Sequence, residues 1–184
     1  MKRENEKEHF SGRVIRVTTD EVLLPNGHRT VLEVVHHPGG AAAVALDERD
    51  RVCLLRQYRY AAGGWLWELP AGKLEPGEPP LLTAQRELAE EAGLTARDWL
   101  DLGVCLTSPG VLTERLYLFR ATAIERTASA HERAEVIEVH WVALEQACLW
   151  ALEGTITDAK TVIGLLRTRH IATLATGAPR AGIP

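Results

Sequence analysis

Three glutamates within five residues, Glu87, Glu90 and Glu91, are the side chains with the clearest capacity for chemistry. A helix is predicted over residues 80–92, because proline favours the first turn of a helix and glycine favours the position after its end. At 3.6 residues per turn the carboxylates share one edge of this helix, beside an apolar stripe. Like charges this close destabilise a helix unless a counter-charge is present. Arg86 can pair with Glu90, and hard cations such as Mg2+ or Mn2+ suit the remaining carboxylates.

The residues around this helix follow an ordered pattern. Written with x for any residue, the pattern is G-x5-E-x7-R-E-(apolar)-x-E-E-x-G-(apolar). An isolated acidic triplet is more often a solvated helix face, but nine such positions coincide by chance on the order of once in 10^7 or 10^8 sequences. The pattern is the Nudix box, and the chain therefore resembles the Nudix hydrolases. The nine residues are Gly72, Glu78, Arg86, Glu87, Leu88, Glu90, Glu91, Gly93 and Leu94.

Four segments outside the box resemble the ADP-ribose pyrophosphatase branch of that family. They are Arg-Gln-Tyr-Arg at 56–59, residues 63–72, Ser-Pro-Gly at 108–110 and Ile-Thr-Asp-Ala-Lys-Thr at 156–161. Pro109 also lies 15 residues beyond Leu94, where the ADP-ribose enzymes characteristically place a proline. The resemblance extends over residues 12–166, nearly the whole chain.

The resemblance implies an α/β fold, the Nudix α/β/α sandwich with a mixed sheet and an N-terminal β-arm. It implies a metal-dependent pyrophosphatase that hydrolyses ADP-ribose to AMP and ribose 5-phosphate with Mg2+, or with Mn2+. Other nucleoside diphosphate derivatives, such as nucleotide sugars, NADH and FAD, are alternative substrates. A nucleotide-sensing domain without turnover is a further alternative, and the intact set of Arg86 and the three glutamates argues against it.

The resemblance also implies roles within the site. The expected metal-site residues are Glu68, the carbonyl of Ala71, Glu87, Glu90 and Glu91, with Glu68 expected to bind a metal-bound water or to support the ligands from behind. Arg86 is expected to hold the glutamates in place, and Glu90 to assist them. Glu114, at the end of the loop 108–114, is expected to orient or deprotonate the attacking water, with a plain loop carboxylate as the alternative.

Substrate contacts are expected from two arginines on a strand that enters the site and from two residues of the arm: Arg29, Glu33, Arg56 and Arg59. A guanidinium can bind phosphate oxygens through paired hydrogen bonds, although a surface salt bridge is an equal alternative for Arg56. In the family an aromatic residue of the arm often stacks on the adenine. Here Val31 and Leu32 stand nearby, so the stacking residue stays open, with Phe10 and Trp65 as candidates.

The elements that must position these residues are predicted mostly as strands. In the N-terminal part, strands are predicted at 13–18, 21–24 and 30–35, with a tight turn at 25–27. Residues 41–46 and 51–58 are predicted to form a hairpin. Further strands are predicted at 66–69, 100–106, 115–121 and 137–142, and helices at 144–152 and 158–169, the second capped by Thr157. The predicted parts are a β-arm over 1–38, a Nudix domain over 39–172 and a poorly ordered tail over 173–184.

Composition narrows the class of protein. A chain of 184 residues, 46% apolar and 25% charged, fits one soluble domain with a substantial core. The apolar run 41–46 is far shorter than the roughly 18 residues of a membrane span, so a cytoplasmic protein without a membrane partner is expected. The net charge of −4 disfavours nucleic acid as a partner. Metal-ligand spacing is absent around Cys53, Cys105, Cys148, His36, His37 and His140, for which structural roles are expected.

A homodimer is expected from the N-terminal arm. In the family branch that this chain resembles, the N-terminal strands pack across a two-fold axis and contribute to the partner's nucleotide pocket. A strand pair is marginally stable alone and gains from burying an apolar face on another surface, although docking on its own domain is the alternative. The apolar residues of the arm are Val14, Ile15, Val17, Val22, Leu23, Leu24, Val31, Leu32, Val34 and Val35.

Overall fold

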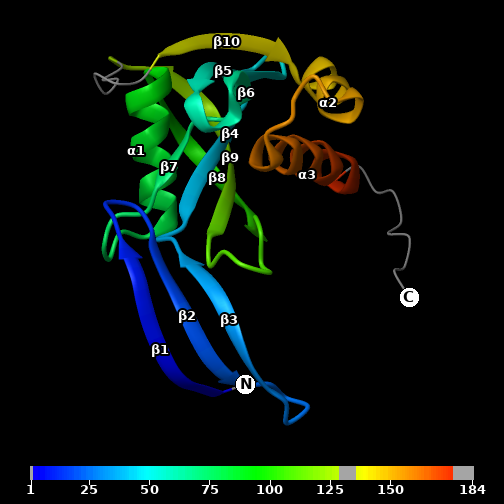
Figure 1. Ribbon diagram of the computed structural model, residues 1–184. Helices are drawn as coiled ribbons and strands as arrows, with labels where there is room; N and C mark the ends of the chain where they lie inside the picture. Colours follow the sequence, from blue (N-terminus) through cyan, green and yellow to red (C-terminus); the bar gives the residue numbers. More distant parts are fainter. Residues whose placement is uncertain (1, 129–135, 176–184) are drawn as a thin grey trace.

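Two sheets and three helices form the body of the protein, and a separate three-stranded sheet forms the arm (Figure 1). The computed structural model describes residues 2–128 and 136–175. The strands are β1 (Lys2–Ser11), β2 (Arg16–Leu23), β3 (Arg29–His36), β4 (Gly40–Ala45), β5 (Arg51–Arg59), β6 (Gly64–Glu68), β7 (Ala71–Lys73), β8 (Leu94–Leu106), β9 (Arg115–Arg126) and β10 (Ile137–Ala143). The helices are α1 (Pro80–Ala92), α2 (Leu144–Glu153) and α3 (Ala159–Ala175), with a short 3-10 turn, η1 (Tyr60–Ala62).

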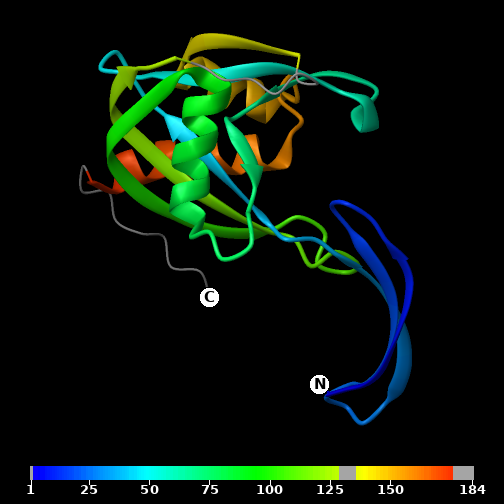
Figure 2. The same cartoon turned by 90° about the vertical axis from the view of Figure 1, so that its left-hand side faces the viewer.

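Strand β4 lies at the centre of the body and is buried along its whole length. It pairs antiparallel with β7 and parallel with β9, in a sheet of order β7-β4-β9-β8. Because side chains alternate along a strand, Ala43 and Ala45 pack with Leu88 of α1, whereas Ala42 and Val44 pack into a cluster that includes residues of α2 and α3. Helices therefore cover both faces, and the expected α/β/α fold with a mixed sheet is confirmed (Figures 1 and 2).

Helix α1 has the predicted bounds, Pro80–Ala92. Pro80 occupies the first turn, where its missing N–H would have no partner in any case. Gly93 ends the helix in the left-handed conformation, with φ 64°, and its N–H donates to the carbonyl of Ala89. Ala84 and Leu88 are fully buried, so the apolar stripe packs on the sheet and the acidic edge lies beside it.

The predicted hairpin of residues 41–46 and 51–58 is wrong. Strand β4 belongs to the four-stranded sheet, whereas β5 pairs with β10 and β6 in a second sheet. The single bridge Leu46–Val52 is what joins the two chain segments, next to a turn in which Asp47 accepts hydrogen bonds from Arg51. A strand has two edges, and those of β4 are already paired with β7 and β9.

The arm holds a strand, β1, that its apolar pattern does not indicate. Strand β1, Lys-Arg-Glu-Asn-Glu-Lys-Glu-His-Phe-Ser, is mostly exposed and has no apolar alternation, so no strand was predicted there. It pairs with β2, which merges the two strands predicted at 13–18 and 21–24, and β2 pairs with β3. Ion pairs tie the strands together: Arg16 to Glu6 at 2.6 Å and Arg29 to Glu4 at 2.9 Å.

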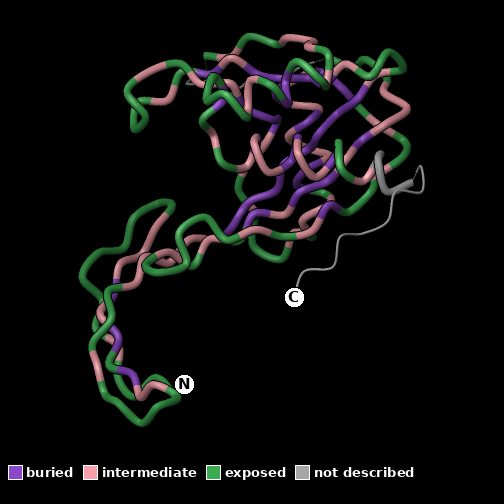
Figure 3. The backbone as a smooth tube through the Cα atoms, turned by 90° about the vertical axis from the view of Figure 1, so that its right-hand side faces the viewer, coloured by how far each residue is buried: buried purple, intermediate pink, exposed green. Residues whose placement is uncertain are grey.

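The arm projects away from the body (Figures 1 and 2) and is exposed over much of its length (Figure 3). Among its apolar side chains, Val22 is buried, but Val31 is 60% exposed and Phe10 is 53% exposed. The arm therefore does not dock on its own domain, which was the alternative to an intermolecular role.

The last helix differs from its prediction at both ends. Asp158, not Thr157, caps it, because its carboxylate accepts the N–H of Thr161 at 3.0 Å. The helix continues to Ala175, three residues into the tail predicted from residue 173, and the rest of that tail lies outside the described residues. In the part of the chain that the structure describes, no helix has both the length and the apolar character needed to cross a bilayer.

Candidate active site

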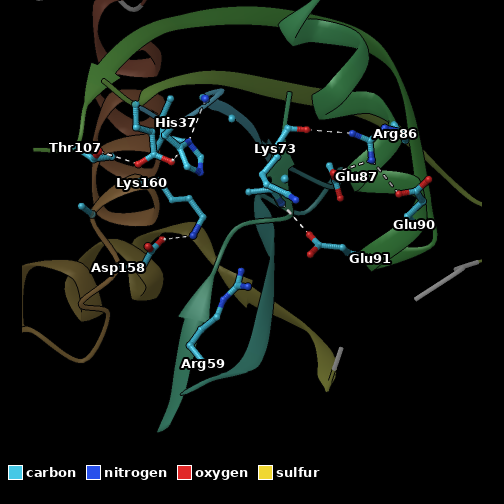
Figure 4. Close-up of a pocket in the computed structure, with 17 residues that line it drawn as sticks. His37, Arg59, Lys73, Arg86, Glu87, Glu90, Glu91, Thr107, Asp158 and Lys160 are labelled. Carbon is cyan, nitrogen blue, oxygen red and sulfur yellow. Dashed lines mark hydrogen bonds and ion pairs between the residues drawn. The ribbon is translucent and has the colours of Figure 1, made fainter. Parts of the chain in front are cut away.

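A cavity of about 440 Å³ opens between α1, β7, the loop before β9 and the start of α3 (Figure 4). The acidic edge of α1 forms one wall. Lys160, Asp158, His37 and Thr107 lie on the opposite side. The polar side chains that line the cavity are His37, Arg59, Lys73, Arg86, Glu87, Glu90, Glu91, Thr107, Glu114, Asp158 and Lys160.

Arg86 binds three carboxylates at once. Its guanidinium lies 2.7 Å from Glu87, 3.1 Å from Glu90 and 3.2 Å from Glu78. Hydrogen bonds from Arg86 and from the hydroxyl of Thr83 hold the pKa of Glu78 at about 2. The hydrogen bond to Glu78 in turn raises the pKa of Arg86. The arginine therefore stays charged and gathers the like-charged glutamates into one wall.

The backbone of β7 lies directly against the acidic edge of α1. Glu91 is 3% exposed and accepts the N–H of Ala71 at 2.8 Å. A Cβ at Gly72 would overlap the present position of the Glu87 carboxylate, so a larger residue there would force that side chain to shift. The short strand β7 therefore packs directly against the glutamates.

The donor set of this wall fits a hard divalent cation. Three carboxylates and a main-chain carbonyl are the oxygen ligands that Mg2+ and Mn2+ prefer, and Arg86 offsets only part of the negative charge. Among the described residues, the group whose ligand atoms all lie within 4.8 Å of one another is a different one, Glu6, Asp20 and His36 of the arm. Arg16 already binds Glu6, and the Thr18 hydroxyl bonds both Asp20 and His36, so this group is held together without an ion.

Glu68 does not line the cavity but is buried behind it, at 2% exposure. It accepts paired hydrogen bonds from Arg59 at 2.8 and 2.9 Å and one from Lys160 at 2.5 Å. Burial alone would raise the pKa of Glu68, but the hydrogen bond from Arg59 and the charge of Lys160 outweigh it and hold the pKa at about 2. Glu68 is thus the fixed counter-ion of two cations that do line the cavity.

Glu114 faces the cavity from the end of the loop, on the side opposite α1. Its Oε2 accepts the hydroxyl proton of Thr107 at 2.7 Å, and its Oε1 lies 3.2 Å from Nδ1 of His37. Its side chain is 19% exposed and lines the cavity. Glu114 and the acidic edge of α1 therefore line the same cavity, as predicted from the sequence.

Three of the four residues predicted to contact the substrate do not line the cavity of their own chain. Arg29 pairs with Glu4 in the arm, and Glu33 is exposed on β3. Arg56 stacks over the ring of Trp67 at 5.2 Å, on the far side of β5. Arg59 does line the cavity.

Several residues that line the cavity were not predicted from the sequence to belong to the site. Lys160 and Asp158 stand within the segment 156–161 that carried the family resemblance, which was the available signal. His37 was expected to be structural, and Lys73 and Thr107 were given no role. Nothing in their spacing indicates the site, because each is brought there by contacts between distant parts of the chain.

An α/β/α sandwich with this pattern of glutamates in its cavity defines the Nudix class. The NUDIX domain model matches residues 36–163, and the chain belongs to this family. The membership expected from the sequence is confirmed.

Several relatives of this chain are ADP-ribose pyrophosphatases. The ADP-ribose pyrophosphatase of Mycobacterium tuberculosis is 37% identical over 167 residues, covering 89% of this chain and 80% of that protein. The methanol dehydrogenase activator of Bacillus methanolicus is 37% identical over 158 residues, 85% of either chain. A crystal structure of an ADP compounds hydrolase has the same fold, with a TM-score of 0.81 over 96% of this chain and 95% of that chain at 21% identity.

Replacing Glu68 by alanine should destabilise the protein by roughly 3–5 kcal/mol, because Arg59 and Lys160 would be left without their buried counter-ion. Urea unfolding measures this, with Glu138→Ala, which removes a 61% exposed carboxylate, as the control expected to change stability by less than about 0.5 kcal/mol. The difference between wild type and Glu68→Ala should be complete above pH 4.5 and shrink as the pH falls toward about 2, since the folded pKa lies below the unfolded one. Equal effects of the two substitutions would contradict the assignment.

Proposed function

We propose that this protein hydrolyses ADP-ribose to AMP and ribose 5-phosphate with Mg2+. The observation that carries the proposal is a single cavity with a carboxylate wall on α1 and two cations, Arg59 and Lys160, on other elements. A diphosphate needs both, because its own charge repels a nucleophile and accumulates on the leaving group. The ADP-ribose pyrophosphatases among the relatives support this choice of diphosphate.

We assign metal binding to Glu87, Glu91 and the carbonyl of Ala71, with Glu90 assisting and Mn2+ as an alternative ion. A divalent cation bound there supplies positive charge toward the phosphate oxygens. The close packing of β7 on α1 supports the assignment, because it holds the backbone of Ala71 and Gly72 against the carboxylates in one cavity. Arg86 orients the glutamates through its two bonds along the helix.

Glu114 is the general base of this proposal. It lies in the same cavity as the α1 carboxylates and has one oxygen bonded to Thr107 and the other beside His37. A base that deprotonates water must be held at hydrogen-bond distance from it, and contributes about 10²- to 10⁴-fold to the rate. Water then adds to a phosphorus atom, the anhydride oxygen leaves with one phosphate, and the proton passes to Glu114.

Arg59 and Lys160 bind phosphate oxygens in this proposal, and Glu68 acts through them and not as a metal ligand. Glu68 holds both cations by short hydrogen bonds from below the cavity, which keeps their remaining N–H groups available to the substrate. Of the two roles expected for Glu68, we therefore choose the supporting one, because its carboxylate already accepts hydrogen bonds from Arg59 and Lys160.

The arm completes the site of a second copy in this proposal. Arg29 and Glu33 lie on β3, away from the cavity of their own chain, and exposed apolar side chains such as Val31 accompany them. A homodimer in which the arm covers the partner's cavity would bury these apolar side chains and bring Arg29 and Glu33 to the nucleotide. Arg56 is then left to its stacking contact with Trp67.

We also propose a cytoplasmic location and a small-molecule substrate rather than nucleic acid. All three cysteines are free, which suits a reducing compartment. The net charge of −4 opposes binding to a polyanion, whereas one diphosphate can be met by local cations and metal.

Glu91→Gln should lower kcat by at least about 100-fold at saturating Mg2+, because a neutral amide is a poor ligand for a hard cation. Stability should change by less than about 1 kcal/mol, since the amide oxygen can still accept the N–H of Ala71. Steady-state kinetics and calorimetric titration with Mg2+ measure the two effects, with Glu125→Gln, an exposed carboxylate, as the control. Turnover within threefold of wild type would remove Glu91 from the metal site.

ADP-ribose should have the highest kcat/KM in a panel with GDP-mannose, NADH and dGTP. The expectation follows from the relatives and from a cavity with two phosphate-binding cations next to the acidic wall. Mg2+-dependent release of AMP and ribose 5-phosphate, measured by chromatography, is the direct readout. If dGTP or GDP-mannose leads, the substrate assignment is wrong although the family membership stands.

Val31→Glu should convert the dimer to a monomer and raise KM for ADP-ribose, because it places a charge in the proposed apolar interface. Sedimentation velocity at micromolar concentration and steady-state kinetics test both effects. Leu152→Glu makes the same kind of change at a 66% exposed leucine of α2 and serves as the control. A variant that stays dimeric with normal KM would refute the shared site.

A further inference from the structure

The connector between the arm and the body is bonded to the loop that carries Glu114. The N–H of Val35 donates to the carbonyl of Val111 at 2.8 Å, and the N–H of Thr113 donates back to Val35 at 3.0 Å. Two residues on, the N–H of His37 donates to the hydroxyl of Thr113 at 3.0 Å. These contacts fix the backbone of the loop up to the residue before Glu114.

The side chain of His37 continues this contact to Glu114 itself. Its Nδ1 lies 3.2 Å from Oε1 of Glu114, and the two side chains are only 14% and 19% exposed. The N–H of Gly39 donates to Nδ1 at 3.1 Å. A ring nitrogen has one position for a proton or a lone pair, so Nδ1 either donates to Glu114 or accepts from Gly39. Donation to Glu114 requires the form of the ring that carries its proton on Nδ1.

Glu114 therefore has a polar neighbour at each of its two oxygens. Thr107 bonds Oε2 and His37 faces Oε1, and among the described residues these two supply the polar contacts of the carboxylate. With one contact alone, the carboxylate could rotate about it. Lys160 and Asp158 also line the cavity, but they are bonded to each other, and Lys160 to Glu68.

Gly39 makes this arrangement sterically feasible. Its φ is 90°, and a Cβ there would lie 2.8 Å from the carbonyl oxygen of Arg115, the residue after Glu114. The connector thus touches the chain on both sides of Glu114, through Thr113 and through Arg115. The contact is built into the backbone and does not depend on the histidine side chain alone.

We propose that His37 is the positioning residue for Glu114, holding Oε1 so that the carboxylate keeps the orientation needed to act on the attacking water. The proposal rests on the role of Glu114 given above. His37 acts through Glu114 and bonds no substrate, so its loss reduces the rate of the chemical step and leaves substrate binding unchanged.

The test compares His37→Ala with His37→Asn in the full-length protein. Alanine should lower kcat about 10- to 100-fold with KM changed less than about threefold, the pattern of a base that is present but misplaced. Asparagine should restore kcat to within about threefold of wild type, because its amide group can stand near the position of Nδ1 and donate to Glu114. His36→Asn, the same change at the neighbouring histidine of the arm, should leave kcat unchanged. Equal kcat losses in the alanine and asparagine variants, or normal kcat in both, would overturn the proposal.

Combination with Glu114→Gln separates this proposal from the function on which it rests. Glu114→Gln alone should reduce kcat by about 100-fold or more, and adding His37→Ala should then have no further effect, because there is no base left to orient. Losses that simply multiply would show that His37 acts elsewhere and would overturn the positioning role while leaving Glu114 as the base. Full activity of Glu114→Gln would remove the base assignment itself and the positioning role with it.

Discussion

The mutual repulsion of the carboxylates along α1 is the constraint on which the site depends. Arg86 bonds Glu87 and Glu90 of the acidic edge and also Glu78, which precedes the helix. Strand β7 packs against that edge through its backbone. Small side chains on β4, such as Ala43 and Ala45, let α1 lie close to the sheet, and Gly72 lets β7 lie close to Glu87. The packing of the core therefore determines how closely the charged helix and strand β7 approach each other.

A second charged system, of opposite sign, stands across the cavity. It is built on Glu68, a buried carboxylate whose role is to fix Arg59 and Lys160 in place. Burying the charge of Glu68 is costly, and the hydrogen bonds from Arg59 and Lys160 offset that cost. The two systems explain how a chain with net charge −4 can attract an anionic substrate: the cations are concentrated in one place, and the excess acid is placed where metal ions can neutralise it.

Local signals allowed the central helix to be predicted to the residue, because Pro80, Gly93 and the apolar period act within a few turns of chain. Strand pairing could not be predicted in the same way. The partner of β4 is chosen among several apolar strands by the whole sheet, and β1 is held by cross-strand ion pairs such as Arg16–Glu6 that leave no apolar pattern. The box residues and Glu114 followed from family resemblance. His37 and Lys160 did not, since their contacts join residues 76 and 92 positions apart.

The bonded connector between β3 and β4 limits how the chain can vary in length. Residues 35–39 are fixed to the loop at Val35, at His37 and at Gly39, so one added or deleted residue would turn the imidazole away from Glu114 and break the pairing that follows. The turn at the far end of the arm, residues 24–28, has no such constraint, being an exposed turn around Gly27 with open space about it. Insertions and deletions are therefore tolerated at the tip of the arm and excluded at its base, where the chain enters the body.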